Sequence, residues 1–182
     1  LLAQGIDPRN IVLAGDSAGG NLVLVTLLRA RAAGVPLPAC AVLLSPALDC
    51  TLDSPSMAAY DGRDPMIRLA SLLVLRRLYV PSPHQYTIPD VSPLFGDFRG
   101  LPPLFFQVGA TELLRDDATR AAEKAFAADV DVELELWPGV AHVFQLAEFL
   151  PEARRAIDHI VRFVRMRARW EDAGAALVTA AY

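Results

Sequence analysis

Ser17 is the residue best suited to act as a nucleophile. It is the third residue of G-D-S-A-G (15–19), which matches the pattern G-x-S-x-G. A short apolar run (11–14) precedes this segment, and a long apolar helical pattern (18–33) follows it. A strand, a sharp turn with serine at its apex and a helix are typical of a nucleophile elbow, which presents the serine hydroxyl to a substrate.

The neighbours of Ser17 fit such a turn. Gly15 and Gly19 lack a Cβ atom, so they should let the strand and the helix approach closely, and Ser17 should adopt a strained backbone conformation. The N–H of Ala18 would lie at the helix N-terminus, where it can donate a hydrogen bond to a developing oxyanion. The alternative interpretation is a glycine-rich turn that only happens to contain serine.

A serine hydroxyl needs a general base, and His142 is the candidate. It follows a predicted strand at 130–137 by a short turn. His142 should therefore lie at the carboxyl edge of the sheet, as should the turn that carries the serine. The other histidines, His84 and His159, fall in a proline-rich segment and inside the last predicted helix, where we expect surface or structural roles.

The base needs a carboxylate that orients it, and Glu112 is the candidate. It follows an apolar run at 104–109 that predicts another strand. Asp116 and Asp117 are rivals, one helical turn further along the chain. Serine, acid and histidine each follow a predicted strand, so we expect all three at one edge of the sheet.

The elements that must position these residues alternate between strands and helices. Their order predicts an α/β fold, a parallel sheet of about four strands with flanking helices and right-handed crossovers. The helix after Ser17 is apolar on nearly every side, so we expect it to be buried. Predicted strands cover 10–15, 39–45, 104–109 and 130–137, and predicted helices cover 18–33, 66–80, 113–128 and 149–169.

The segment 46–100 differs from its surroundings because proline, serine, aspartate and glycine interrupt it. It is too long for a plain connection, so we expect an insertion over one end of the sheet. Its helix at 66–80 should begin at Asp64 and Pro65. Some of its apolar side chains could line an acyl or alcohol pocket, although core packing is the commoner role: Met57, Tyr60, Leu69, Leu73 and Tyr79.

Composition limits the class of protein. The chain has 182 residues, 53% of them hydrophobic and 21% charged, which suits one globular domain. A net charge of −4 gives no general attraction to nucleic acid or anionic membranes, and no apolar run is long enough to span a bilayer. The first residues lack a signal-peptide pattern and a starting Met, so we expect further residues upstream and a cytoplasmic protein.

Cys40 and Cys50 fit no metal-binding or redox spacing, so we expect free thiols in a reducing compartment. The sequence contains no metal-ligand cluster and no phosphate-binding loop. We therefore expect no metal and no cofactor, and a small molecule as the binding partner.

The chain resembles the hormone-sensitive-lipase-like branch of the α/β-hydrolases, the bacterial carboxylesterases, over nearly all of residues 1–168. The most specific match is G-D-S-A-G-G-N-L at 15–22, and the order serine, acid, histidine is that of the fold. The acid of this branch is usually an Asp in a D-P-L-x-D-E-like segment. E-L-L-R-D-D (112–117) takes that place here, so the resemblance implies Glu112 as the acid. Further matches are D-P-M (64–66), S-P-L (92–94), L-P-P (101–103) and H-V-F (142–144).

The chain departs from that family because the motif H-G-G-G, which completes the oxyanion hole, is absent. Loss of one oxyanion donor typically costs about 10²–10³ in rate. The resemblance therefore implies a partial α/β-hydrolase fold, the C-terminal part of an esterase, with a catalytic domain at 1–170, a cap-like insertion at 46–100 and a tail at 171–182. The strand at 10–15 would then form an apolar edge, which is open to pairing in a homodimer.

These residues and the resemblance imply a serine carboxylesterase or lipase-type hydrolase of short-to-medium acyl esters. Ser17 would attack the ester, His142 would transfer the proton, Glu112 would orient the imidazole and Ala18 would stabilise the oxyanion. Water would then hydrolyse the acyl-enzyme. A catalytically impaired relative that binds a small molecule and an inactive fragment are the alternatives.

Overall fold

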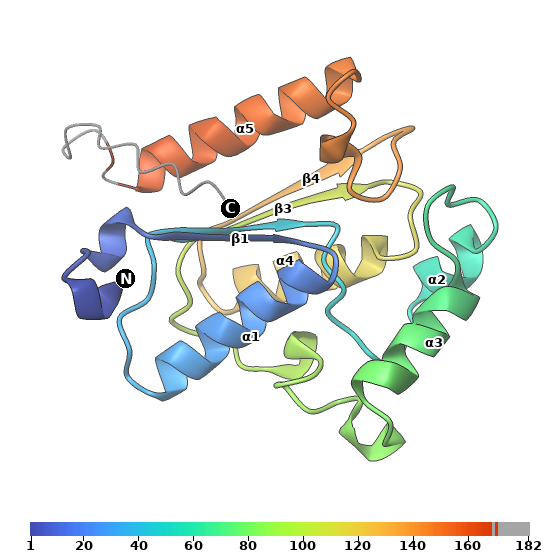
Figure 1. Ribbon diagram of the computed structural model, residues 1–182, viewed down its shortest axis with the longest axis horizontal. Coiled ribbons are helices and arrows are strands. Elements are labelled where there is room, and N and C mark those ends of the chain that lie inside the picture. Colours follow the sequence, from blue (N-terminus) through green and yellow to red (C-terminus); the bar gives the residue numbers. More distant parts are fainter. Residues whose placement is uncertain (169, 171–182) are drawn as a thin grey trace.

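A computed structural model describes residues 1–168 and 170. Its centre is a four-stranded parallel sheet in the order β1-β2-β3-β4, which confirms the predicted α/β fold (Figure 1). The strands are β1 (Val12–Asp16), β2 (Cys40–Leu44), β3 (Leu104–Gly109) and β4 (Val132–Trp137). The α-helices are α1 (Ala18–Ala32), α2 (Pro55–Tyr60), α3 (Leu69–Tyr79), α4 (Arg115–Ala127) and α5 (Pro151–Arg167). Short 3₁₀ helices cover Leu2–Gln4, Pro8–Asn10, Pro83–Gln85, Pro93–Phe95 and Phe144–Leu146.

The strands end along one common edge because the residues near their carboxyl ends pair with one another across the sheet. Asp16 pairs with Leu44, Leu44 with Gln107 and Gln107 with Glu135. The turns after all four strands therefore lie at the carboxyl edge, where open α/β sheets bind ligands. Figure 1 shows α2 and α3 beyond this edge, next to the arrowheads of the strands.

Helices cover both faces of the sheet. In Figure 1, α1 and α4 lie on one face and α5 lies on the other. The larger core lies under α1 and α4 and contains the fully buried Leu24, Leu27 and Phe106. On the opposite face, Phe105 stacks on Phe163 of α5, with ring centroids 5.0 Å apart. The central strands are thus covered on both faces, whereas β1 and β4 are the edges of the described sheet; the edge position of β1 was predicted.

The prediction that α1 is buried on nearly every side is wrong. Leu24 and Leu27 are fully buried, but Leu22 is 58% exposed and Thr26 is also exposed. The helix packs on the sheet and on the 3₁₀ helix Pro93–Phe95, and these contacts leave Leu22 accessible.

Two element boundaries differ from the prediction for local reasons. β1 begins at Val12 because the preceding Pro8–Asn10 form a 3₁₀ helix. Asp64 Oδ1 accepts hydrogen bonds from the N–H groups of Met66 and Ile67 at 2.8 and 3.1 Å, but α3 begins only at Leu69. Asp64 therefore caps a turn that precedes the helix, and the predicted start of the helix is wrong.

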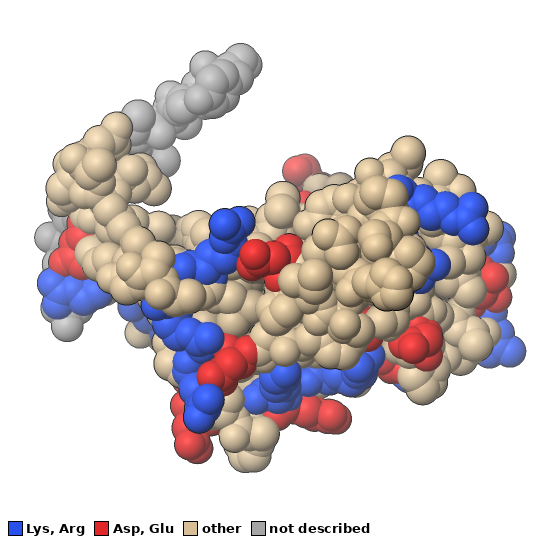
Figure 2. Space-filling view, turned by 90° about the horizontal axis from the view of Figure 1, so that it is seen from below, with Lys and Arg blue, Asp and Glu red and all other residues tan. Residues whose placement is uncertain are grey.

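Charged side chains are mixed on the surface. Figure 2 shows Lys and Arg beside Asp and Glu on the face seen from below, around a broad area without charge. No helix within residues 1–168 is long and apolar enough to cross a membrane. The predicted tail at 171–182 and the predicted last helical residue, Arg169, lie outside the described residues.

Both cysteines carry free thiols, as predicted. Cys40 is buried in the core under α5, and burial raises the pKa of its thiol to about 11. Cys50 is half-buried, and burial raises the pKa of its thiol as well. Both groups are therefore protonated and weakly nucleophilic at neutral pH.

Candidate active site

Ser17 lies on a sharp turn between β1 and α1, with φ 52° and ψ −118°. This backbone conformation is strained for a residue with a side chain, as predicted. Two backbone hydrogen bonds hold the turn: Ser17 N–H donates to Leu44 O at 2.8 Å, and Ser17 O accepts from Ala47 N–H at 3.0 Å. Ala18 is the first residue of α1, so its N–H has no acceptor within the helix.

Two glycines make this turn possible. A Cβ atom on Gly15 would lie 2.4 Å from the backbone C and O of Gly19, so only glycine fits. The expectation for Gly19 itself is wrong, since a Cβ there meets only Asp16 Oδ1 at 3.8 Å, an ordinary contact. Gly20 is the second position that requires glycine, because a Cβ would lie 2.6 Å from Pro46 Cβ.

Glu112 and His142 meet at the carboxyl edge of the sheet. Glu112 Oε1 lies 3.2 Å from His142 Nδ1. The residues are 1% and 8% exposed, so the contact is shielded from water. Glu112 follows β3, and its Oε2 also accepts a hydrogen bond from Gly109 N–H at 3.0 Å. A carboxylate held at Nδ1 orients the ring and leaves Nε2 available for proton transfer.

Ser45 belongs to the same arrangement, although its residue type and spacing did not point to a role in the site. Its Oγ donates to Glu112 Oε2 at 2.9 Å and accepts from Val143 N–H at 3.2 Å. Ser45 is fully buried and has a φ of 44°. It thus joins Glu112 to the segment that carries His142. Its place directly after β2, at the shared carboxyl edge, is the signal that could have revealed it.

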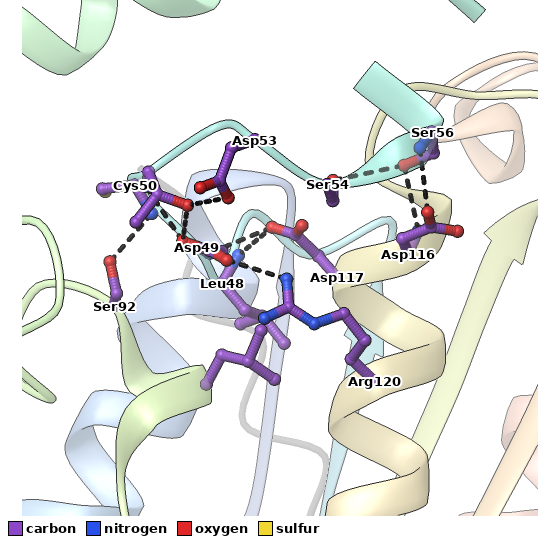
Figure 3. A network of polar contacts seen from close by, with 12 residues as sticks. Leu48, Asp49, Cys50, Asp53, Ser54, Ser56, Ser92, Asp116, Asp117 and Arg120 are labelled. Atoms are coloured by element: carbon purple, nitrogen blue, oxygen red, sulfur yellow. Dashed lines mark hydrogen bonds and ion pairs between the residues drawn. The ribbon is translucent and has the colours of Figure 1, made fainter. Parts of the chain in front are cut away.

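Asp116, the first rival acid, makes its contacts elsewhere. Its Oδ2 accepts a hydrogen bond from Ser56 N–H at 2.8 Å (Figure 3), and its Oδ1 lies 2.7 Å from Arg115 Nη2. These contacts join the start of α4 to α2, and Asp116 makes no hydrogen bond to His142.

Asp117, the second rival, is completely buried beneath the segment that follows β2. Its Oδ2 accepts from Leu48 N–H at 2.7 Å and from Asp49 N–H at 3.0 Å. Burial raises the pKa of Asp117 to about 8, so this carboxyl is protonated at neutral pH. Asp49 is in turn paired with Arg120 at 2.8 Å (Figure 3). The network fixes the segment after β2 to α4.

The remaining histidines have other environments. His84 is exposed in a 3₁₀ helix, and His159 Nδ1 lies 2.7 Å from Glu135 Oε1. Neither contacts Ser17 or Glu112. Within residues 1–168, no group of three or more His, Cys, Asp or Glu is arranged to hold a metal ion.

A cavity of about 350 Å³ opens beside Ser17. Its wall is mostly apolar, and neither Glu112 nor His142 contributes to it. Asn21 Nδ2, at this wall, donates to Ala47 O at 2.8 Å and Val91 O at 3.0 Å, which joins α1 to two loops. The lining comes from the serine turn with α1, the segment after β2, α3 and the start of α4: Ser17, Ala18, Asn21, Leu22, Ala47, Asp49, Cys50, Leu52, Leu72, Leu75, Arg76, Tyr79 and Leu114.

Only one of the five apolar residues considered for a pocket lines this cavity, namely Tyr79. Met57 is buried in a core cluster against which Tyr60 and Leu69 pack, and this cluster shares Leu114 with the cavity wall. Leu73 neither lines the cavity nor belongs to the cluster that contains Met57. Core packing is thus the role of three of these residues.

The chain matches one protein family and is similar in sequence to curated hydrolases. Residues 2–146 match the family described as alpha/beta hydrolase fold. An esterase of Acinetobacter venetianus is 40% identical over 164 residues, which are 90% of this chain and 54% of the relative. An acetyl-hydrolase of Streptomyces hygroscopicus is 40% identical over 166 residues, which are 91% of this chain and 55% of the relative.

The structural comparison agrees with the sequence comparison. The crystal structure of an esterase from the bacterial hormone-sensitive lipase family has a TM-score of 0.89 and 42% identity. The match covers 92% of this chain and 57% of that chain. The chain thus spans about half the length of the curated relatives that it matches. By its sequence, its parallel sheet and the turn at Ser17, the chain belongs to the alpha/beta hydrolase fold family and resembles the esterases of the hormone-sensitive lipase branch.

Proposed function

We propose that this chain supplies the catalytic residues of a carboxylic ester hydrolase. Ser17 is the nucleophile, His142 is the general base and Glu112 is the orienting acid. The observation that supports this assignment is the 3.2 Å contact between Glu112 Oε1 and His142 Nδ1, at the sheet edge that also carries the strained turn of Ser17. Relatives named esterase and acetyl-hydrolase agree with an ester of a short acyl group as the substrate.

The first half of the reaction acylates the serine. Ser17 Oγ attacks the carbonyl carbon of the ester while His142 Nε2 accepts the hydroxyl proton. The imidazolium that forms donates its Nδ1–H to Glu112, whose negative charge stabilises it. Ala18 N–H donates to the oxyanion. When the tetrahedral intermediate collapses, the alcohol leaves with the proton from His142.

The second half of the reaction releases the acid. Water attacks the carbonyl carbon of the acyl-enzyme, and His142 Nε2 accepts a proton from that water. The intermediate collapses, Ser17 Oγ leaves and takes the proton back from His142. The carboxylic acid departs and the residues return to their starting protonation states.

We propose that residues 46–100 form a cap whose helix α3 and the segment after β2 enclose the acyl chain. The support is the mostly apolar cavity, which these segments share with Ser17. Burial of a methylene group contributes about 0.8 kcal/mol, so kcat/KM should rise about fourfold per added methylene until the cavity is filled. Short-to-medium acyl esters are the expected substrates.

Hydrolysis of p-nitrophenyl esters with acyl chains of increasing length tests this function. Ser17→Ala should abolish turnover, whereas the matched control His84→Asn, at an exposed histidine, should leave it unchanged. Turnover that survives Ser17→Ala would overturn the assignment. Ester binding without turnover in the wild type would favour the alternative role as a binding protein.

Pairing of two copies along the edge strand β1 and a cytoplasmic location stay predictions. Ala14 of β1 is exposed in the single chain, so this edge is open. Light scattering of the purified chain measures its oligomeric state, and a monomer at all concentrations would contradict the pairing.

A further inference from the structure

Arg76 is one of the residues that line the cavity that contains Ser17. It lies in the last turn of α3. Its Nη1 donates to Cys50 O at 3.2 Å and to Thr51 O at 2.7 Å. Its guanidinium carbon lies 4.3 Å from the ring centroid of Tyr86. The loop and the ring therefore hold the guanidinium in one place, although its side chain is long and flexible.

The charge of Arg76 has no anionic partner among the described residues. Asp49 is the other charged residue of the cavity wall, and its carboxylate is paired with Arg120 at 2.8 Å. Arg76 is half-buried, and carbonyl oxygens with an aromatic face compensate a partly desolvated guanidinium only in part. The ion-paired arginines within residues 1–168 are Arg9, Arg99, Arg115, Arg120, Arg155 and Arg167.

The rest of the wall determines what kind of ligand could reach this charge. Leu52, Leu72, Leu75 and Leu114 give the cavity an aliphatic lining. In ligand sites of this kind, a few polar groups fix the orientation and the specificity of an otherwise apolar ligand. A ligand that complements both the aliphatic lining and Arg76 has an aliphatic middle and one anionic end.

We propose that the cavity selects esters that carry a carboxylate at the end of a short aliphatic chain, and that Arg76 pairs with this carboxylate. The guanidinium fork matches the two oxygens of a carboxylate, and such charged hydrogen bonds are about twice as strong as neutral ones. The inference rests on the proposed function, since Ser17 would attack the ester group at the other end of the chain.

Matched ligand pairs test the proposal in the intact chain. Monomethyl adipate and methyl hexanoate differ by a carboxylate on the acyl side. The acetate ester of a hydroxypentanoic acid and pentyl acetate differ by a carboxylate on the alcohol side. Dissociation constants are measured by calorimetry with the Ser17→Ala variant, so that binding is recorded without turnover. The charged member of at least one pair should bind about 10- to 100-fold more tightly.

Variants at two adjacent arginines assign the preference to one side chain. Arg76→Gln keeps a donor for the loop carbonyls but removes the charge, so the preference should disappear. Arg77→Gln is the matched control, because Arg77 is exposed and does not line the cavity. It should keep the preference. Equal binding of both members in both pairs would overturn the proposal, as would an unchanged preference in a folded Arg76→Gln variant.

The two proposals fail in different ways. A preference for the charged ligand without hydrolysis by the wild type would refute the esterase assignment and support the role of Arg76. Hydrolysis of neutral esters without any preference for the charged ligand would support the esterase assignment and refute the role of Arg76. The comparison of charged and neutral ligands needs no change at Arg76, so it decides the question even where Arg76→Gln lowers stability.

Discussion

Ser45 Oγ donates a hydrogen bond of 2.9 Å to Glu112 Oε2, on the oxygen that does not face His142. The same hydroxyl accepts from Val143 N–H at 3.2 Å. One buried serine therefore fixes both the carboxylate and the backbone beside the histidine. Each oxygen of Glu112 has a donor on it, which limits rotation of the carboxylate.

We expect Ser45→Ala to lower kcat about tenfold and to leave KM nearly unchanged. Hydrogen bonds to charged groups contribute about 1.5–3 kcal/mol, and this one orients a group that does not hold the substrate. Steady-state kinetics on a p-nitrophenyl ester measures the effect. Ser71→Ala, at an exposed position of α3, is the control. A kcat equal to that of the control would contradict a positioning role for Ser45.

Replacement of Glu112 distinguishes the acid from its rivals. Glu112→Gln preserves the shape but loses the charge that stabilises the imidazolium, so kcat should fall by about 10²–10⁴. Asp116→Asn should retain most of the activity, because Asp116 is bound to Ser56 and Arg115. The opposite ranking of the two variants would move the acid to Asp116.

The turn at Ser17 predicts opposite effects for two neighbouring glycines. Gly15→Ala places a methyl group 2.4 Å from the backbone of Gly19, so the chain must shift at a cost of about 1–3 kcal/mol or more. Gly19→Ala has room and lies inside α1, where alanine is favoured by up to about 1 kcal/mol. Urea unfolding of both variants measures the difference. Equal losses in stability would refute the close approach at Gly15.

Asp117 predicts how stability depends on pH. Burial raises its pKa from 3.8 to about 8 in the folded chain. Between these values the folded chain holds a proton that the unfolded chain has lost, so stability falls as pH rises from about 4 to about 8 and then levels off. Asp117→Asn removes this dependence. The Tm of Asp117→Asn should therefore rise relative to that of the wild type as pH increases across this range. Each kcal/mol of stability that the wild type loses should add about 2–4 °C to this difference.

Asp97→Asn is the control for the titration of Asp117. Hydrogen bonds from Arg99 lower the pKa of Asp97, which is exposed. The stability that Asp97 contributes is present above its ordinary pKa and is lost as pH falls through the lowered value. This pH dependence has the opposite sign to that of Asp117. Melting curves at about pH 5, pH 7 and pH 8.5 compare the variants. A Tm difference between Asp117→Asn and wild type that is constant with pH would contradict the burial effect.

The edge that carries the site was predictable from the sequence because strands in a parallel sheet end on one side. Ser17, Glu112 and His142 each follow a predicted strand, so their common location required no knowledge of distances. Ser45 also follows such a run, but its role depends on a φ of 44° and on two partners distant in sequence. Neither this backbone angle nor the identity of these two partners can be deduced from residue types and spacing.

Two other features depend on tertiary packing. The pattern of α1 is apolar all round, yet Leu22 is exposed because only one side of the helix meets the sheet. The cavity wall includes Arg76, whose position depends on carbonyl groups of a loop 25 residues earlier in the chain. A helical pattern predicts that such residues form a helix, but it does not predict what packs against each side.

The proposed esterase function depends on the activation of Ser17 by His142. The most direct measurement is reaction of the intact chain with a fluorophosphonate, followed by mass spectrometry of the peptides. We expect a single adduct on Ser17 in the wild type and a labelling rate that falls by at least about 10³ in His142→Asn. A folded wild-type chain without an adduct on Ser17, or one labelled equally fast without His142, would contradict this activation.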